Sequence, residues 1–440
     1  MKKRLLATLL SSTLVMTSLA GCSSKSENGD MVTELTKPIT IEMWHYMNGG
    51  QAEVLNEIIE DFNATNDKGI TVNAISQGSI VDLNKKVISA AQSNSLPAII
   101  NVYPDIATGL IEDKKLVNLS SFINDKNVGM ADEMDDFVDS FIQETSQWNN
   151  GEVYGLPMTK STEVLYVNKN MLESLGYTFE DLEGLTFVKL AEISNTAVTE
   201  LGVAGFGFDS SSNAFISSLK MNGLDFVDSK GTINVDNEWV REYMTFFQKQ
   251  AESGAFRIAG EDKFLSNPFV NQKMLCYQGS SAGYAYLNNG GAFEIAVVEV
   301  PVFEGKDKAV IQQGASLFVT NNVSAEAQYA AYEFVKFATN AENTAKFATA
   351  TGYLPVRKSA VETEIVKNIL NDETSLYSQV YNVAQKSLPY SYYTPAINNA
   401  QSARTVAQEK YEAFMSGSIK DVEVLVDDIV SQVQTSIGRN

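Results

Sequence analysis

Histidine and cysteine, which many catalytic and metal sites require, are almost absent from this chain. Its 440 residues include one histidine, His45, and two cysteines, Cys22 and Cys276. A serine hydrolase could use one histidine, but no G-x-S-x-G motif accompanies it. Two cysteines exclude a cysteine-rich zinc site. We therefore expect no metal, no cofactor and no nucleophilic catalysis.

Carboxylates are the remaining candidates for chemistry. The chain has 54 acidic residues, and a pair of them could act as acid and base in a glycosidase. No stretch of the sequence singles out such a pair. A secreted glycosidase or phosphodiesterase thus stays open as an alternative to a protein that only binds its ligand.

Cys22 has a second kind of chemistry available. The charged start Lys2–Arg4 precedes an apolar run of about 15 residues, shorter than the ~20 that cross a membrane. Leu19-Ala20-Gly21-Cys22 then matches the lipobox of bacterial lipoproteins. We predict that residues 1–21 are a signal peptide and that Cys22 carries a diacylglyceryl anchor. This places the protein at the cell membrane, on its extracellular or periplasmic side.

The residues after Cys22 have the composition of a flexible linker. Ser23–Asp30 is polar throughout, so residues 22–37 are predicted to be a flexible, lipidated tether. Once Cys22 is acylated, Cys276 is the remaining thiol, and no intramolecular disulfide can form. Met274–Tyr277 has the pattern of a strand, so Cys276 is expected to be a small buried residue.

Net charge limits the partners. The formal charge is −21, and loss of the three basic residues at the start makes it −21 − 3 = −24. Such a chain does not bind nucleic acid through a general basic surface. A single arginine in a closed cleft could still bind an anion.

The elements that would position a site alternate between strands and helices. Strands are predicted at 39–44, 70–75 and 97–103, with helices at 54–62 and 82–93 between them. This order indicates an α/β fold with a parallel sheet covered on both faces. Ligands of such sheets bind beyond the carboxyl ends of the strands, near Gly49-Gly50 and Tyr103-Pro104-Asp105.

The rest of the chain contains further strands and helices and no long linker. Two lobes are therefore expected to interleave. Strands are predicted at 164–167 and 295–301, and helices at 239–251, 325–340 and 400–415.

The chain resembles the extracellular solute-binding proteins of ABC sugar importers, and most closely their glycerol-phosphate branch. The segments that carry the resemblance are Ile41–His45, Pro97–Ile99, Ser161–Lys169, Gly314–Leu317, Ala350–Pro355, Ala403-Arg404 and the pair Ser280-Ser281.

The resemblance implies a two-lobe periplasmic-binding-protein fold of type II, like maltose-binding protein, with a hinge between the lobes. Crossings are implied near Val153–Pro157, Val297–Pro301 and 338–343. The first lobe would comprise 38–153 and 302–338, and the second 154–301 and 339–440.

The resemblance also implies a ligand site, position by position. Arg404 matches an arginine that pairs with phosphate, and Ser161 and Ser281 match hydroxyls that bind the ligand. Gly314 matches a glycine whose backbone faces the ligand, and Tyr353 a tyrosine that donates to it. A phosphate ester suits such a set, because a planar guanidinium and neutral donors satisfy its oxygens.

Other positions depart from the glycerol-phosphate branch. An expected tyrosine falls on Ile80, and an expected glutamate falls on Pro104, although Asp105 follows. Phe208, Asp209 and Ser212 stand where tryptophans would stack on glycerol. The phosphate end of the site thus looks retained and the alcohol end rebuilt, which favours a glycerophosphodiester or another polyol or sugar phosphate over glycerol phosphate itself.

These observations predict a monomeric binding lipoprotein that delivers a small phosphate ester to an ABC permease. A neutral oligosaccharide is the alternative ligand. A cleft with Arg404 among hydroxyls would favour phosphate, whereas a long, aromatic-lined cleft would favour sugar.

Overall fold

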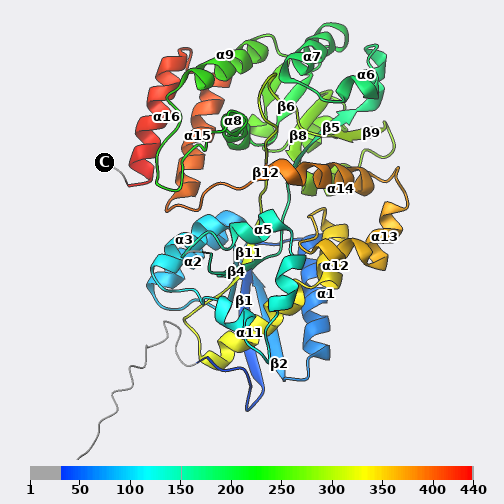
Figure 1. The fold of residues 1–440 in the computed structure, drawn as a ribbon. Helices are drawn as coiled ribbons and strands as arrows, with labels where there is room; N and C mark the ends of the chain where they lie inside the picture. Colours follow the sequence, from blue (N-terminus) through cyan, green and yellow to red (C-terminus); the bar gives the residue numbers. More distant parts are fainter. Residues whose placement is uncertain (1–30, 150, 439–440) are drawn as a thin grey trace, which may run out of the picture.

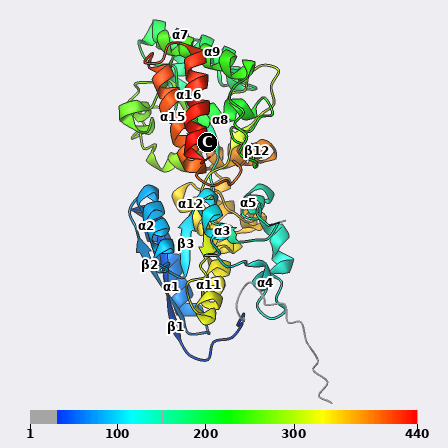
Figure 2. The same cartoon turned by 90° about the vertical axis from the view of Figure 1, so that its left-hand side faces the viewer.

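The computed structural model describes residues 31–149 and 151–438, and it divides them into two α/β lobes stacked end to end (Figures 1 and 2). The predicted type II two-lobe fold is confirmed. Cys22 and the signal peptide lie outside the described residues. None of the described helices is long and apolar enough to cross a membrane.

The first lobe contains a five-stranded sheet in the order β2-β1-β3-β11-β4. Its strands are β1 (Ile39–His45), β2 (Ile70–Ser76), β3 (Ile99–Val102), β4 (Gly155–Pro157) and β11 (Ser316–Val319). Its helices are α1 (Gly50–Thr65), α2 (Ile80–Gln92), α3 (Pro104–Glu112), α4 (Ser120–Ile123), α5 (Asp139–Glu144), α11 (Ala325–Ala338), α12 (Ala341–Thr351) and α13 (Glu364–Leu370).

Side chains alternate across this sheet, as period-two geometry requires. Met43 packs in a hydrophobic core on one face, and its neighbour Trp44 packs in a second core on the other. Helices therefore cover both faces, as predicted. The sheet is mixed rather than parallel, however, because β11 runs antiparallel to both β3 and β4.

The second lobe repeats the arrangement with the sheet order β7-β6-β8-β5-β9. Its strands are β5 (Glu163–Asn168), β6 (Phe206–Phe208), β7 (Phe256–Ile258), β8 (Cys276–Ser280) and β9 (Ile295–Val298). Its helices are α6 (Lys169–Ser174), α7 (Phe187–Leu201), α8 (Ser211–Lys220), α9 (Glu238–Glu252), α10 (Ser266–Val270), α14 (Leu376–Ser387), α15 (Ala400–Met415) and α16 (Val422–Ser436).

Three crossings join the lobes, and each lies later in the chain than expected. The first two occupy residues 158–162 and 312–315, between strands of different sheets, and the third occupies residues 371–375, between α13 and α14. The expected third crossing at 338–343 is instead the turn between α11 and α12. Phe347 of α12 packs in the same core as Met43, so residues 339–370 belong to the first lobe. A short ladder of β10 (Val310–Ile311) and β12 (Ser391–Tyr392) lies beside the second crossing.

The start of the folded region also differs from the prediction. Val32 and Leu35 pack against the first-lobe core, although both fall within the predicted tether 22–37. The segment from Val32 to Leu35 therefore packs on the first lobe and is not part of a free tether.

Candidate functional site

A cavity of about 850 Å³ lies between the lobes. α2 and α3 line it from the first lobe, and residues 394–404 line it from the second. Ile311 of β10 and residues 312–314 of the second crossing form part of its wall. Three residues predicted for the site, Arg404, Asp105 and Gly314, line this cavity together.

Arg404 reaches the cavity from the first turns of α15. Ala403 and Ala407, on the buried face of that helix, pack into the second-lobe core and fix its position. The Arg404 Nη2 donates to Asn213 Oδ1 and, at 3.5 Å, to Ser212 Oγ. Both partners are neutral and come from α8.

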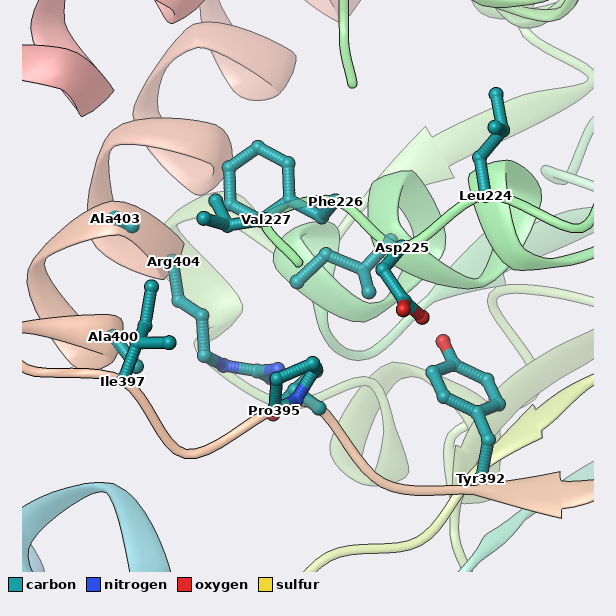
Figure 3. A pocket seen from close by; sticks show the side chains of 12 residues that line it. Leu224, Asp225, Phe226, Val227, Tyr392, Pro395, Ile397, Ala400, Ala403 and Arg404 are labelled. Carbon is teal, nitrogen blue, oxygen red and sulfur yellow. The ribbon is translucent and has the colours of Figure 1, made fainter. Parts of the chain in front are cut away.

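A second, small hollow of about 20 Å³ also borders Arg404. Figure 3 shows the side chains that line it. Ile397, Ala400 and Ala403 are among its mostly apolar lining. The hollow is about the size of one water molecule and is therefore too small for a ligand. Its lining residues surround the Arg404 side chain.

A buried carboxylate stands behind the partners of Arg404. Asn213 Nδ2 donates to Glu163 Oε1 at 2.7 Å, and Gln278 Nε2 donates to Glu163 Oε2 at 2.8 Å. Burial raises the pKa of Glu163, and these two hydrogen bonds oppose the rise. We did not predict Glu163 as a site residue. The sequence signal that could have identified it is a charged residue at the first position of the buried strand Glu163–Asn168.

Asp105 faces Arg404 from the first lobe. It lies in the first turn of α3, where its Oδ1 accepts a 2.8 Å hydrogen bond from the Ile106 amide. Burial raises the pKa of Asp105, and this hydrogen bond and the charge of Arg404 oppose the rise. The carboxylate and the guanidinium thus interact across the cavity.

Gly314 lies where the first two crossings touch. Its φ is +123°, and a Cβ there would be 1.6 Å from the Thr159 carbonyl oxygen, so no other residue fits. Lys160 Nζ donates to the Gly314 carbonyl at 3.1 Å and forms a buried ion pair with Glu144 of α5.

The remaining predicted residues lie beside the cavity rather than along it. Ser161 is buried on the first crossing, where its backbone pairs with that of Gln313. Ser281 Oγ accepts a 3.3 Å hydrogen bond from the Thr162 amide. Tyr353 stacks on Phe347, and its hydroxyl lies beside that of Tyr46.

The positions that depart from the glycerol-phosphate branch fall into two groups, those that line the cavity and those that do not. Ile80, Pro104 and Ser212 line the cavity, whereas Phe208 is buried in the second-lobe core. Asp209 is only partly exposed; burial raises its pKa to about 6, although Leu265 N donates to its Oδ1 at 2.6 Å. Neither Phe208 nor Asp209 lines the cavity, so of these positions Ile80, Pro104 and Ser212 can reach a ligand in it.

Comparison with known proteins shows which family the chain matches. Residues 57–371 match the family described as bacterial extracellular solute-binding protein. The sn-glycerol-3-phosphate-binding periplasmic protein UgpB of Rhizobium meliloti is 23% identical over 414 residues, covering 90% of this chain and 94% of that protein. The UgpB of Salmonella typhimurium is 22% identical over 396 residues, covering 86% and 88%.

Solved structures show the same fold. UgpB from Mycobacterium tuberculosis in complex with glycerophosphocholine has a TM-score of 0.78 at 20% identity, covering 92% of this chain and 99% of that one. The substrate-binding protein Lmo0181 from Listeria monocytogenes, in complex with cycloalternan, has a TM-score of 0.78 at 15% identity, covering 92% and 100%.

Proposed function

The chain belongs to the family of bacterial extracellular solute-binding proteins, and we propose that it captures a phosphate ester for an ABC importer. The ligand class is glycerol 3-phosphate or, in preference, a glycerophosphodiester. Membership in this family makes the chain a solute-binding protein and not an enzyme.

The observation that carries the proposal is Arg404 in the interlobe cavity. In the part of the chain that the structure describes, both of its hydrogen bonds use Nη2 and go to neutral side chains. The rest of the guanidinium fork remains for a ligand in the cavity. A planar fork suits two oxygens of one phosphate group better than it suits a neutral sugar.

Neutral donors and Asp105 would complete the contacts. Closure of the two lobes would bring the hydroxyls and amides of the crossings toward the phosphate and exclude water from the pair. Asp105, on the opposite wall, would accept hydrogen bonds from the alcohol hydroxyls of a glycerol moiety. The names of the relatives agree with a glycerol phosphate compound as ligand.

A neutral oligosaccharide is the second candidate, and the cavity lining argues against it. Tyr103 is the one aromatic residue among the described residues that line the cavity. Sugar rings are usually held by several aromatic faces, and the resemblance to sugar-binding structures concerns the fold.

Delivery would require a membrane location and a partner. The lipobox at Cys22 supports a lipid anchor on the outer side of the cell membrane. The released ligand would pass to the permease subunits of the importer, with the binding protein acting as a monomer.

Thermal unfolding with candidate ligands tests the ligand class. Glycerol 3-phosphate, glycerophosphocholine, sugar phosphates and maltodextrins are compared, because a ligand at 100 times its Kd stabilises the fold by about 2.7 kcal/mol. Stabilisation by maltodextrins alone would replace the phosphate proposal with the sugar one.

Calorimetry on Arg404 variants tests the anion site. Arg404→Ala should weaken a phosphate ligand by roughly 30-fold to several thousand-fold, because it leaves the phosphate desolvated and unpaired. Arg404→Lys should recover part of the affinity, since a point charge cannot form the fork. Arg241→Ala, which removes a surface arginine from α9, is the matched control and should bind normally. Unchanged affinity in Arg404→Ala would place the anion elsewhere.

A further inference from the structure

The feature that the proposed function leaves unexplained is the buried Glu163. Glu163, at the start of β5, is 3% exposed, and Asn213 on α8 is 1% exposed. No lysine or arginine pairs directly with Glu163 among the described residues. A buried carboxylate without a direct cationic partner normally destabilises a fold, so its position calls for a reason.

The direction of the hydrogen bonds links Glu163 to Arg404. Asn213 Oδ1 accepts from the guanidinium, which leaves its Nδ2 to donate to Glu163. Gln278 donates to the other carboxylate oxygen. Glu163 therefore accepts at both oxygens, as an ionised carboxylate does, and it fixes the amide orientation that presents Asn213 Oδ1 to Arg404.

The charges around Arg404 are unfavourable for a doubly charged ligand. The groups that interact electrostatically with Glu163 are Arg404, Asp209 and the hydroxyl of Tyr392. Asp105 adds a second carboxylate near the guanidinium from the first lobe. The nearby Lys160–Glu144 pair contributes no net charge. One guanidinium thus faces at least two carboxylates.

We propose that Glu163 is a positioning and specificity-determining residue: through Asn213 it fixes Arg404, and its charge makes the site select singly charged phosphodiesters over doubly charged phosphomonoesters. This inference rests on the proposed function. A fixed negative charge repels a dianion about twice as strongly as a monoanion at the same place. A phosphomonoester loses its second proton near pH 6, whereas a diester keeps a single charge.

The experiment uses calorimetry at pH 8 and pH 5.5 to measure the affinities of glycerophosphoglycerol, a diester with one negative charge and no cation, and of glycerol 3-phosphate. The wild-type protein should prefer the diester at pH 8, and the preference should narrow at pH 5.5, where the monoester takes up a proton. Glu163→Gln keeps the side-chain shape and should shift the affinity ratio toward the monoester by roughly tenfold at pH 8. A merely structural role for Glu163 would alter both affinities alike.

Two further variants control the result. Glu333→Gln removes a buried carboxylate from α11 in the other lobe and should leave the ratio unchanged. Asn213→Asp places a further carboxylate in direct contact with Arg404 and should weaken binding of the monoester more than binding of the diester. This variant tests the effect of charge if Glu163→Gln fails to fold.

Each outcome bears on one of the two proposals. A wild-type protein that binds neither phosphate ligand overturns the proposed function. A wild-type preference for the monoester at pH 8, or a ratio that neither Glu163→Gln nor Asn213→Asp changes, overturns the role of Glu163 and leaves the proposed function standing.

Discussion

At the scale of single residues, the site depends on charges that the overall composition hides. The chain carries a formal charge of −21, yet the proposed ligand is an anion. Surface charges are screened by salt over about 8–10 Å, whereas a guanidinium in a narrow cleft acts at contact distance and in a lower dielectric. Under the proposed function, Arg404 and its two acidic neighbours would therefore select the anion that binds, despite the acidic surface.

His45 gives a residue-scale prediction about pH. It is buried at the end of β1, where its Nδ1 accepts a 3.1 Å hydrogen bond from the Met47 amide. Burial lowers the pKa of His45 from 6.5 to about 4. Stability from the neutral ring is thus complete above pH 6.5, the unfolded value, and is lost as pH falls toward 4.

Denaturant unfolding at pH 7.5 and pH 4.5 checks this. Because other groups titrate in the same range, wild type is compared with His45→Gln, which cannot take up the proton. The wild-type loss of unfolding free energy should exceed that of the variant by about 2–3 kcal/mol. Equal losses would mean that the ring is as easily protonated in the folded state as in the unfolded chain.

At the scale of elements, the lobes are joined where two crossings and α5 meet. The Lys160 side chain is fully buried on the first crossing and pairs with Glu144, which also accepts from Gln312 of the second crossing at 3.3 Å. The pair and Gly314 hold the two crossings together. Burial raises the pKa of Glu144, and Lys160 opposes that rise.

Lys160 and Glu144 give the element-scale prediction. Lys160→Met should lower the unfolding free energy by about 3–5 kcal/mol at pH 7.5, because it leaves a buried carboxylate unpaired. The double variant Lys160→Met, Glu144→Leu should recover most of that loss, since both charges are gone. Denaturant unfolding measures all three proteins. A double variant no more stable than the single one would mean that packing, not charge, sets the loss.

Local patterns in the sequence predicted many elements of this fold. The strand at 39–44 and the helix at 400–415 match β1 and α15 closely, because their periodicity and flanking glycines or asparagines are local signals. β11 was missed: it enters the first sheet after the chain has formed all five strands of the second-lobe sheet. Its partners β3 and β4 are distant in sequence, and no local pattern encodes such pairing.

The site, too, was predictable only in part. Arg404, Asp105 and Gly314 line one cavity as the resemblance implied, whereas Ser161, Ser281 and Tyr353 lie beside it. The roles predicted for all six in binding remain predictions. Glu163 and Asn213 were missed, because their importance comes from a hydrogen-bond chain between β5, α8 and α15 that only the tertiary structure brings together.

At the scale of the whole molecule, the N-terminal segment determines how far the first lobe can lie from a lipid anchor. Val32 and Leu35 pack on the first-lobe core, so any anchor at Cys22 would be joined to that lobe by a short segment, from 23 to 31. The lobes could then open and close while the first lobe stays near the membrane. The function proposed for the molecule therefore depends on Cys22 as well as on the cleft.

Replacement of Cys22 tests this dependence. Cys22→Ser removes the sulfur that accepts the diacylglyceryl group, so the protein should appear in the medium or remain as an uncleaved precursor. Fractionation of expressing cells and mass spectrometry of the protein distinguish these states from the anchored form. Cys276→Ser is the control: that thiol is buried, its pKa is raised by burial, and its Sγ contacts the Gly205 carbonyl, so the variant should stay anchored. A correctly processed Cys22→Ser protein that remains on the membrane would show that retention does not need the lipid, and the lipobox would then be a chance match.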